Sequence, residues 1–352
     1  MLDQPTTIDW RTLMTLHLTT ELLTLHTTHP FIIARGGHSE FRTVMVKVAD
    51  DDGVEGWGEA AATAFYGETL ATVQAAFATY APLLGDDPFA LDAIERRLES
   101  ALGGNAAARV AISAALHDLV GKRLGIPLWQ YWGLDRTKAP RSTFTIGIDT
   151  PEMIRRKVAE AAGYPVLKVK LGTPNDLEIL KTIREATDKE LRVDANCGWT
   201  ATHAVTMLPV LAEFGVTVLE QPVMPTDLAG LAHIRRQAKI PIIADESCVT
   251  SAHIPALVGA VDGINIKLAK CGSLREALRM IAIARAHGMM VMVGCMIESS
   301  IGITAAAHFT PLVDIVDLDG AALLRDDPFA GATIPAGQVT LPDGPGLGVT
   351  RR

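Results

Sequence analysis

The sequence of 352 residues lacks the features that would link it to a membrane, to nucleic acid or to a bound nucleotide. No apolar run approaches the roughly 20 residues of a transmembrane helix. Basic residues are not clustered, and the net charge of -8 disfavours nucleic acid. The nucleotide-binding motifs GxGxxG and GxxxxGK[ST] do not occur. The first ten residues have neither the basic nor the apolar region of a secretory signal, so we expect a cytoplasmic protein.

Cysteine is scarce, and its four positions contain no CxxC pair, so a disulfide framework is not expected. Each cysteine follows a segment that we predict to be a barrel strand. These thiols either pack as small apolar groups or ligate a metal, and the abundance of oxygen ligands nearby favours packing. The positions are Cys197, Cys248, Cys271 and Cys295.

The first third of the chain predicts an α+β unit. Residues 11–49 alternate in the manner of strands, and Asp52-Gly53 is a hairpin signal. Residues 68–125 have helical character, broken at 103–105. Hydrophobic residues make up 48% of the chain, enough for a large core. Strands followed by helices indicate a separate domain, which we assign to residues 1–130.

From Arg141 onward, short apolar strands alternate with helical segments, which is typical of a parallel barrel. Seven strands are clear and an eighth, at 312–319, is weaker. We assign the barrel to residues 131–330, and we expect residues 331–352 to form a tail that packs back on the first domain. The strands are expected at STFTIGI, PVLKVKL, ELRVDAN, VTVLEQP, PIIADES, VDGINIKLA, MMVMVGCMI and LVDIVDLD.

Ionisable residues recur at the expected strand ends with steps of 24, 26, 25, 22, 31 and 21 residues. Each step is about the length of one strand–helix unit. Because parallel barrel strands all end on one rim, we expect these side chains to converge. The series is Lys170, Asp194, Glu220, Asp245, Lys267, Glu298 and Asp319.

Three of these residues predict a divalent metal site. Asp194, Glu220 and Asp245 each follow an apolar strand, and converging carboxylates repel one another unless a cation lies between them. Hard oxygen ligands favour Mg²⁺ over zinc. Asn196, Gln221 and Glu246 are expected to support the ligands from behind.

Two lysine positions predict a pair of bases. Lys168 and Lys170 are two residues apart and face the same side of a strand, where burial and like charge would lower their pKa values. Alternatively, they are surface lysines of an edge strand. Lys267 is expected across the barrel from Lys170, whereas Lys270 is expected to face solvent or a loop. Two bases on opposite faces of a metal-held carboxylic acid would invert its α-carbon through an enediolate.

These residues resemble the enolase superfamily, in its muconate-lactonising subgroup. The resemblance spans nearly the whole chain and rests on the KxK pair, the three carboxylates and the segment NIKLAKCG around Lys267. It implies an α+β capping domain on a modified (β/α)7β barrel, with Mg²⁺ as the cofactor. It also implies capping loops near residues 30–40 and 57–68 that close over the site. We expect a homo-oligomer.

Within that subgroup, the segments at 295–309 and 316–320 resemble dipeptide epimerases. The resemblance implies that Asp317 and Asp319 bind the α-ammonium of a dipeptide of the L-Ala-L-Xaa type, whose C-terminal residue is epimerised. Alternatively, VDLDG is a solvated turn. The resemblance further implies that Lys168 contributes to substrate binding. Additional substrate contacts are expected from Arg35, Thr145, Met296, Ile297 and Glu298.

Several other functions fit parts of this pattern. An N-acylamino acid racemase, an o-succinylbenzoate synthase or a cycloisomerase would share the barrel site but would not need Asp317 and Asp319. A Schiff-base aldolase would use a buried lysine as a nucleophile. A binding barrel without catalysis would leave the site residues without a role. Arg35 lies near the loop position that pairs with glutamate in Ala-Glu epimerases, so the second side chain is either acidic or apolar.

Overall fold

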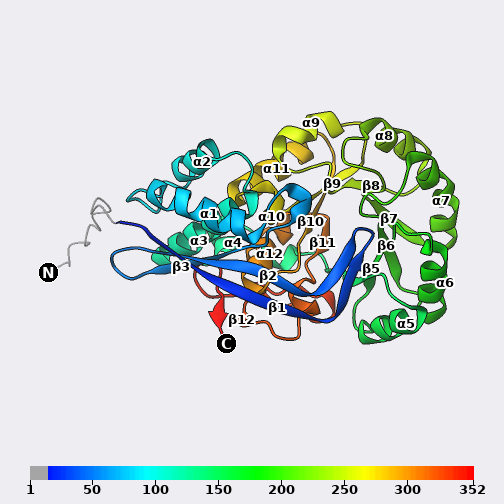
Figure 1. Cartoon of the computed structure of the whole chain (residues 1–352), viewed down its shortest axis with the longest axis horizontal. Coiled ribbons are helices and arrows are strands. Elements are labelled where there is room, and N and C mark those ends of the chain that lie inside the picture. The colour runs from blue at the N-terminus through cyan, green and yellow to red at the C-terminus, as the bar shows by residue number, and fades with distance from the viewer. Residues whose placement is uncertain (1–14) are drawn as a thin grey trace.

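The computed structural model describes residues 15–352, so residues 11–14 of the first predicted strand and the N-terminal ten residues lie outside it. An antiparallel sheet in the order β1-β2-β3 comes first in this part of the chain (Figure 1). A turn at Asp51 and Asp52 connects β2 to β3 at the predicted hairpin. The strands are β1 (His17–Ile33), β2 (Gly36–Ala49) and β3 (Glu55–Ala60).

The long helix α3 packs against this sheet because two glycines of β3 allow a close approach. A Cβ atom on Gly56 would lie 1.8 Å from the carbonyl oxygen of Ala115, and one on Gly58 would lie 1.9 Å from that of Ala111. Any larger residue would therefore force α3 away from β3. The first helices are α1 (Leu70–Tyr80), α2 (Leu91–Ala101), α3 (Ala106–Leu124) and α4 (Leu128–Tyr131).

Within residues 15–352, eight parallel strands form the nearly closed barrel, in the order β11-β10-β9-β8-β7-β6-β5-β4. The seam between β4 and β11 is closed by a bridge from Ser142 to Val316. All eight predicted strands are present, including the weak eighth. They are β4 (Phe144–Ile146), β5 (Val166–Lys170), β6 (Glu190–Asp194), β7 (Val216–Glu220), β8 (Ile242–Ala244), β9 (Gly263–Lys267), β10 (Met290–Gly294) and β11 (Ile315–Asp317).

Helices cover the outside of the barrel, and α5 to α8 form its outer arc (Figure 1). Apolar strands buried between these helices and the barrel interior explain the continuous apolar runs of the sequence. The helices are α5 (Pro151–Glu160), α6 (Asp176–Ala186), α7 (Ala201–Glu213), α8 (Leu228–Gln237), α9 (Ile254–Leu257), α10 (Leu268–Cys271), α11 (Leu274–Ala286) and α12 (Ser300–Ala307). The predicted modified barrel with an N-terminal α+β domain is confirmed.

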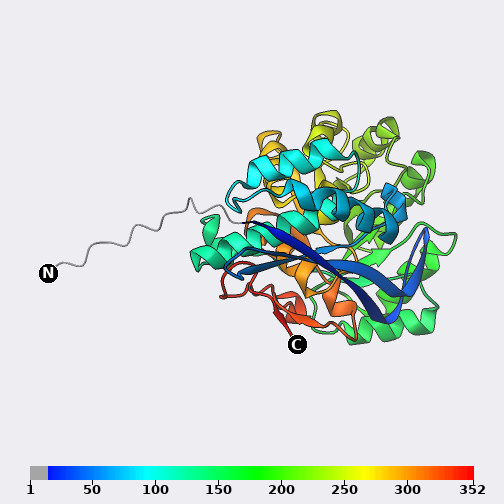
Figure 2. The same cartoon turned by 60° about the vertical axis from the view of Figure 1, so that its left-hand side comes forward.

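The N-terminal sheet is attached to the barrel by a buried carboxylate. Glu59 of β3 accepts hydrogen bonds from the backbone N–H groups of Ser299 and Gly302, each at 3.1 Å, and from the hydroxyl of Thr43 at 2.7 Å. These two N–H groups belong to the start of α12, where helices leave donors unpaired. In both views the β1–β2 hairpin runs past the N-terminal helices and ends beside the first barrel strands (Figure 2).

The C-terminal segment contacts the first domain. Gly346 forms a bridge with Pro127, and the N–H of Leu347 donates to Asp118 of α3 at 2.7 Å. The domain limits at residues 130 and 330 remain predictions. The four cysteines, all within the described residues, form no disulfide. Among residues 15–352, no helix is both long and apolar enough to cross a membrane.

Candidate active site

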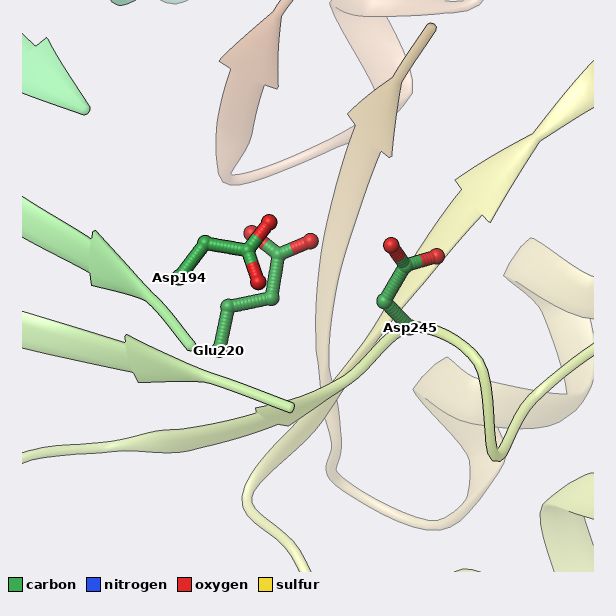
Figure 3. A group of neighbouring side chains, drawn as sticks. All are labelled: Asp194, Glu220 and Asp245. Carbon is green, nitrogen blue, oxygen red and sulfur yellow. The ribbon is translucent and has the colours of Figure 1, made fainter. Parts of the chain in front are cut away.

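Three carboxylates meet at the carboxyl ends of neighbouring barrel strands. Asp194 ends β6, Glu220 ends β7, and Asp245 directly follows β8. One oxygen from each lies within 4.8 Å of the others, and all three side chains are buried (Figure 3). The register explains this proximity, because Lys170 pairs with Asp194 and Asp194 pairs with Glu220 at one level of the sheet.

Lysines flank these carboxylates on both sides. Lys170 of β5 contacts Asp194 at 2.7 Å, and Lys267 of β9 contacts Asp245 at 2.7 Å. Since β6, β7 and β8 separate β5 from β9, these two lysines lie on either side of the three carboxylates. The side chain of Lys168 lies deeper and contacts Glu220 at 2.8 Å and Asp194 at 3.2 Å.

The lysines change how the carboxylates titrate. Burial acts to raise the pKa of Asp194, but Lys170 and Lys168 outweigh it and lower that pKa to about 2. Lys267 and Lys270 likewise hold the pKa of Asp245 below its usual value against burial. Burial and the Asp194 charge raise the pKa of Glu220 to about 7. A cluster with one carboxylate that is hard to ionise is suited to accept a cation.

The expected lowering of lysine pKa values is wrong for Lys168. Burial acts to lower the pKa of Lys168, but Asp317, Glu220 and Asp194 raise it well above its usual value. The pKa of Lys267 is also raised, because Asp245 outweighs burial. The prediction considered burial and the like charge of the neighbouring lysine but omitted the carboxylates that surround Lys168.

Amide side chains hold the carboxylates in place. Asn196 donates to Asp194 at 3.1 Å, and the side-chain oxygen of Gln221 accepts the N–H of Asp245 at 2.9 Å. Asn265 donates to Glu220 at 2.7 Å and was missed from the sequence. It lies two residues before Lys267 on β9, so the alternation that placed Lys168 beside Lys170 would have found it.

Lys270 does not face solvent, and that part of the expectation is wrong. Its side chain is fully buried and donates to the carboxylate of Asp245 at 2.5 Å. It also donates to the backbone carbonyls of Asp245 at 2.6 Å, Asn265 at 3.0 Å and Cys248 at 3.1 Å. The helix α10 begins immediately after Lys267, and its single turn directs Lys270 back under Asp245.

Three buried oxygens near the carboxylates have no hydrogen-bond partner within residues 15–352. They are Oδ1 of Asn196, Oδ1 of Asn265 and Oε2 of Glu246. Burial and the charge of Asp245 raise the pKa of Glu246. Buried oxygens without donors are uncommon in folded proteins, and they indicate a bound ion or water in their vicinity. This observation and the three carboxylates fit a hard divalent cation such as Mg²⁺.

Asp317 and Asp319 stand in different environments on the last strand. Asp317 accepts hydrogen bonds from Lys168 at 2.7 Å and from the hydroxyl of Thr143. Asp319 accepts the backbone N–H of Thr145 at 2.5 Å, and no lysine or arginine of the described chain forms an ion pair with it. Burial, followed by the charge of Asp317, raises the pKa of Asp319 to about 7. Of these two carboxylates, Asp319 is therefore the one without a cationic partner in the described chain.

The capping loop places Arg35 beside the site. Its guanidinium pairs with Glu246 at 2.9 Å, donates to the carbonyl of Asn196 at 2.6 Å, and lies 4.2 Å from the ring centroid of Phe65. Both predicted capping loops thus meet over the barrel, since Arg35 comes from one and Phe65 from the other. The charge of Arg35 is compensated by Glu246.

The segment between β10 and α12 lies next to the last strand. Cys295 contacts the carbonyl of Asp317, and Met296 lies against Gly320. Ile297 and Glu298 are buried. The regular series of ionisable residues suggested that Glu298 stands at a strand end. It does not, because β10 ends at Gly294. It accepts the N–H of Met296 at 3.1 Å, and burial raises its pKa to about 7.

Comparison with known proteins identifies the family. Residues 17–133 match the family model described as mandelate racemase / muconate lactonizing enzyme, N-terminal domain, and residues 152–352 match enolase C-terminal domain-like. The chain belongs to the enolase superfamily. The predicted family is confirmed, and so is the prediction of an isomerase, since the curated relatives are named as epimerases.

Three relatives illustrate this similarity. An L-Ala-D/L-Glu epimerase of Bacteroides thetaiotaomicron is 43% identical over 92% of this chain and 85% of its own length. A hydrophobic dipeptide epimerase of a Flavobacteria bacterium is 38% identical over 93% of this chain and 95% of its own. The dipeptide epimerase of Enterococcus faecalis V583, solved with Mg and L-Leu-L-Tyr, has a TM-score of 0.90 at 34% identity and covers 95% of this chain and 99% of that chain.

The buried contacts of Lys270 generate a stability prediction. Lys270→Met should lower the free energy of unfolding by about 3–5 kcal/mol, because it removes one of the two ammonium groups that pair with the buried carboxylate of Asp245. The matched control is Lys181→Met on the exposed side of α6, where the change should be within about 0.5 kcal/mol. Chemical denaturation of the two variants in parallel tests this. Equal stability of both variants would show that Lys270 is dispensable.

Proposed function

We propose that this enzyme is a Mg²⁺-dependent dipeptide epimerase that inverts the α-carbon of the C-terminal residue by transferring protons between two lysines. The observation that carries the proposal is the arrangement of Lys170 and Lys267 on either side of the three carboxylates, with the unpaired Asp319 further along the rim. The relatives that act on dipeptides support the same conclusion.

Asp194, Glu220 and Asp245 would hold the metal ion. When bound there, Mg²⁺ supplies the positive charge that stabilises a carboxylate losing its α-proton. The amides of Asn196 and Asn265 orient two of the three carboxylate ligands, and the affinity for the metal ion depends on such contacts. Lys270 contacts one oxygen of Asp245 at 2.5 Å, and Lys267 contacts the other at 2.7 Å.

Lys170 and Lys267 would exchange roles between the two directions of the reaction. In its neutral form, one lysine removes the α-proton from one face of the substrate. In its ammonium form, the other lysine returns a proton to the opposite face of the enediolate. General acid and base groups need this direct access to the reacting atom. Burial excludes the water that would otherwise compete as a proton donor.

Asp319 would bind the α-ammonium of the dipeptide. It is buried, carries no ion pair in the described chain and stands at the rim, where a substrate held at the lysines would extend. Asp317 is already paired with Lys168, so its main contribution is to orient Lys168 and close the barrel seam with Thr143. A buried carboxylate of this kind discriminates against uncharged or acylated termini, which leave it unpaired.

The environment of Arg35 supports an uncharged second side chain. A free arginine beside the site would favour an acidic residue, but Glu246 compensates the charge of Arg35 and Phe65 covers its face. An acidic side chain would have to displace Glu246, a buried partner, to reach it. Opposite charges held in such a low-dielectric position are costly to separate.

The first prediction concerns the metal. Exhaustive chelation should abolish turnover, and Mg²⁺ should restore it. Glu220→Gln should weaken Mg²⁺ binding, which calorimetry measures. Because Glu220 would be a direct ligand, the loss of affinity should exceed the roughly 10–100-fold that follows removal of a residue that only supports a ligand. Glu213→Gln, an exposed change at the end of α7, serves as the matched control and should bind Mg²⁺ normally. Full activity after chelation would exclude a metal-dependent reaction.

The second prediction concerns the two bases. Lys170→Ala and Lys267→Ala should each reduce epimerisation in both directions by at least about 10²–10⁴-fold, because each direction needs one proton acceptor and one donor. Exchange of the α-proton with solvent should survive for only one epimer in each variant. The measurement is chiral chromatography combined with mass spectrometry in D₂O. Normal epimerisation by Lys267→Ala would refute the assignment.

The third prediction concerns Asp319. Asp319→Asn should lower kcat/KM for free dipeptides by roughly 10–100-fold, equivalent to about 1.5–3 kcal/mol for a charge-assisted contact. Its Mg²⁺ affinity should match that of the unaltered enzyme, because Asp319 contacts none of the three carboxylates. N-acetylated dipeptides should be poor substrates. If they are turned over as well as free dipeptides, N-acylamino acid racemisation replaces the proposed reaction.

A further inference from the structure

A cavity of about 200 Å³ lies between the N-terminal hairpin and the start of the barrel. Residues 27–31 of β1 form one wall, and residues from β4, α5 and the short 3-10 turn η6 (Ala321–Leu323) form the others. The volume is far above the roughly 30 Å³ that one water molecule takes up in the liquid. The cavity can therefore hold a side chain much larger than a methyl group.

The cavity adjoins both ends of the proposed substrate path. Thr145 lines it and donates its N–H to Asp319 at 2.5 Å. Leu323 lines it as well, and its N–H donates to the carbonyl of Asp319 at 3.0 Å. On the other side, the ring centroid of Phe31 lies 6.0 Å from Nζ of Lys170. The cavity thus shares lining residues with the surroundings of both Lys170 and Asp319.

The walls suit an uncharged, apolar group. Phe31, Phe144 and Leu323 contribute apolar surface. The charged groups around the cavity are already paired, since Lys157 contacts Asp149 at 2.9 Å and His29 contacts Glu160 at 2.7 Å. A charged ligand would have to break one of these pairs or remain unpaired, and either outcome is costly.

We propose that this cavity binds the side chain of the N-terminal residue of the dipeptide, and that the enzyme prefers dipeptides whose first residue is large and apolar. The inference rests on the proposed function, because it takes Lys170 and Asp319 as the two fixed points of the substrate. The first α-carbon carries both the ammonium held by Asp319 and the side chain. That side chain therefore emerges next to Thr145 and Leu323, at the mouth of the cavity.

The test compares dipeptides that share one second residue and carry glycine, alanine, leucine or phenylalanine in the first position. The readout is kcat/KM for deuterium incorporation at the C-terminal α-carbon in D₂O with Mg²⁺ present. The kcat/KM of dipeptides that begin with leucine or phenylalanine should exceed that of the dipeptide that begins with glycine by roughly 10–100-fold, as expected for filling an apolar pocket. Equal values, or a preference for glycine, would overturn the proposal.

Two substitutions that fill the cavity from different elements sharpen the test. Thr28→Phe on β1 and Ala322→Phe on η6 should each reduce the leucine-to-glycine ratio of kcat/KM at least tenfold. The matched control is Thr24→Phe, which is exposed on the same strand outside the cavity and should retain the ratio of the unaltered enzyme. An unchanged ratio in both filling variants would contradict the assignment of this cavity.

The outcomes separate the two proposals. If no dipeptide incorporates deuterium, the proposed function fails, and the assignment of the cavity fails with it. If dipeptides incorporate deuterium but the first side chain has no effect, the epimerase stands and the cavity assignment alone is wrong.

Discussion

The site depends on the balance of charge between buried carboxylates and buried lysines at the mouth of the barrel. Asp194, Glu220 and Asp245 could not share a volume free of water without cations, since like charges at this separation repel strongly. Lys168, Lys170 and Lys267 supply that charge from the flanking strands. In the proposed reaction, two of these same side chains, Lys170 and Lys267, serve as the base and the acid.

The scaffold supports this balance from two directions. Parallel register sets Lys170, Asp194 and Glu220 at one level, so their proximity follows from strand pairing. The N-terminal domain then covers the rim, because Glu59 joins β3 to α12 and Arg35 joins the hairpin to Glu246. Removal of water at the rim strengthens every charge interaction beneath it. The capping domain is therefore part of the active-site environment.

Sequence periodicity was sufficient to predict the barrel and the convergence of the carboxylates, since both depend on the regular spacing of strand–helix units. It could not place Lys270, because the one-turn helix after β9 redirects a side chain that the spacing left in a loop. It also misjudged Lys168, whose pKa depends on the carboxylate of Asp317, 149 residues away in the chain. The pairing of Arg35 with Glu246 was equally inaccessible, because it depends on how the hairpin lies over the barrel.

The epimerisation of a free dipeptide by two bases is the central claim, and the isotopic content of the first product formed in D₂O tests it most directly. Starting from a single, fully protonated epimer with Mg²⁺ present, the product epimer should carry one deuterium at the C-terminal α-carbon from the earliest turnovers. This result is expected because the lysine that donates the proton is not the one that removed it. A product that retains the substrate's own hydrogen would contradict the account, since a single base would then return the proton that it took.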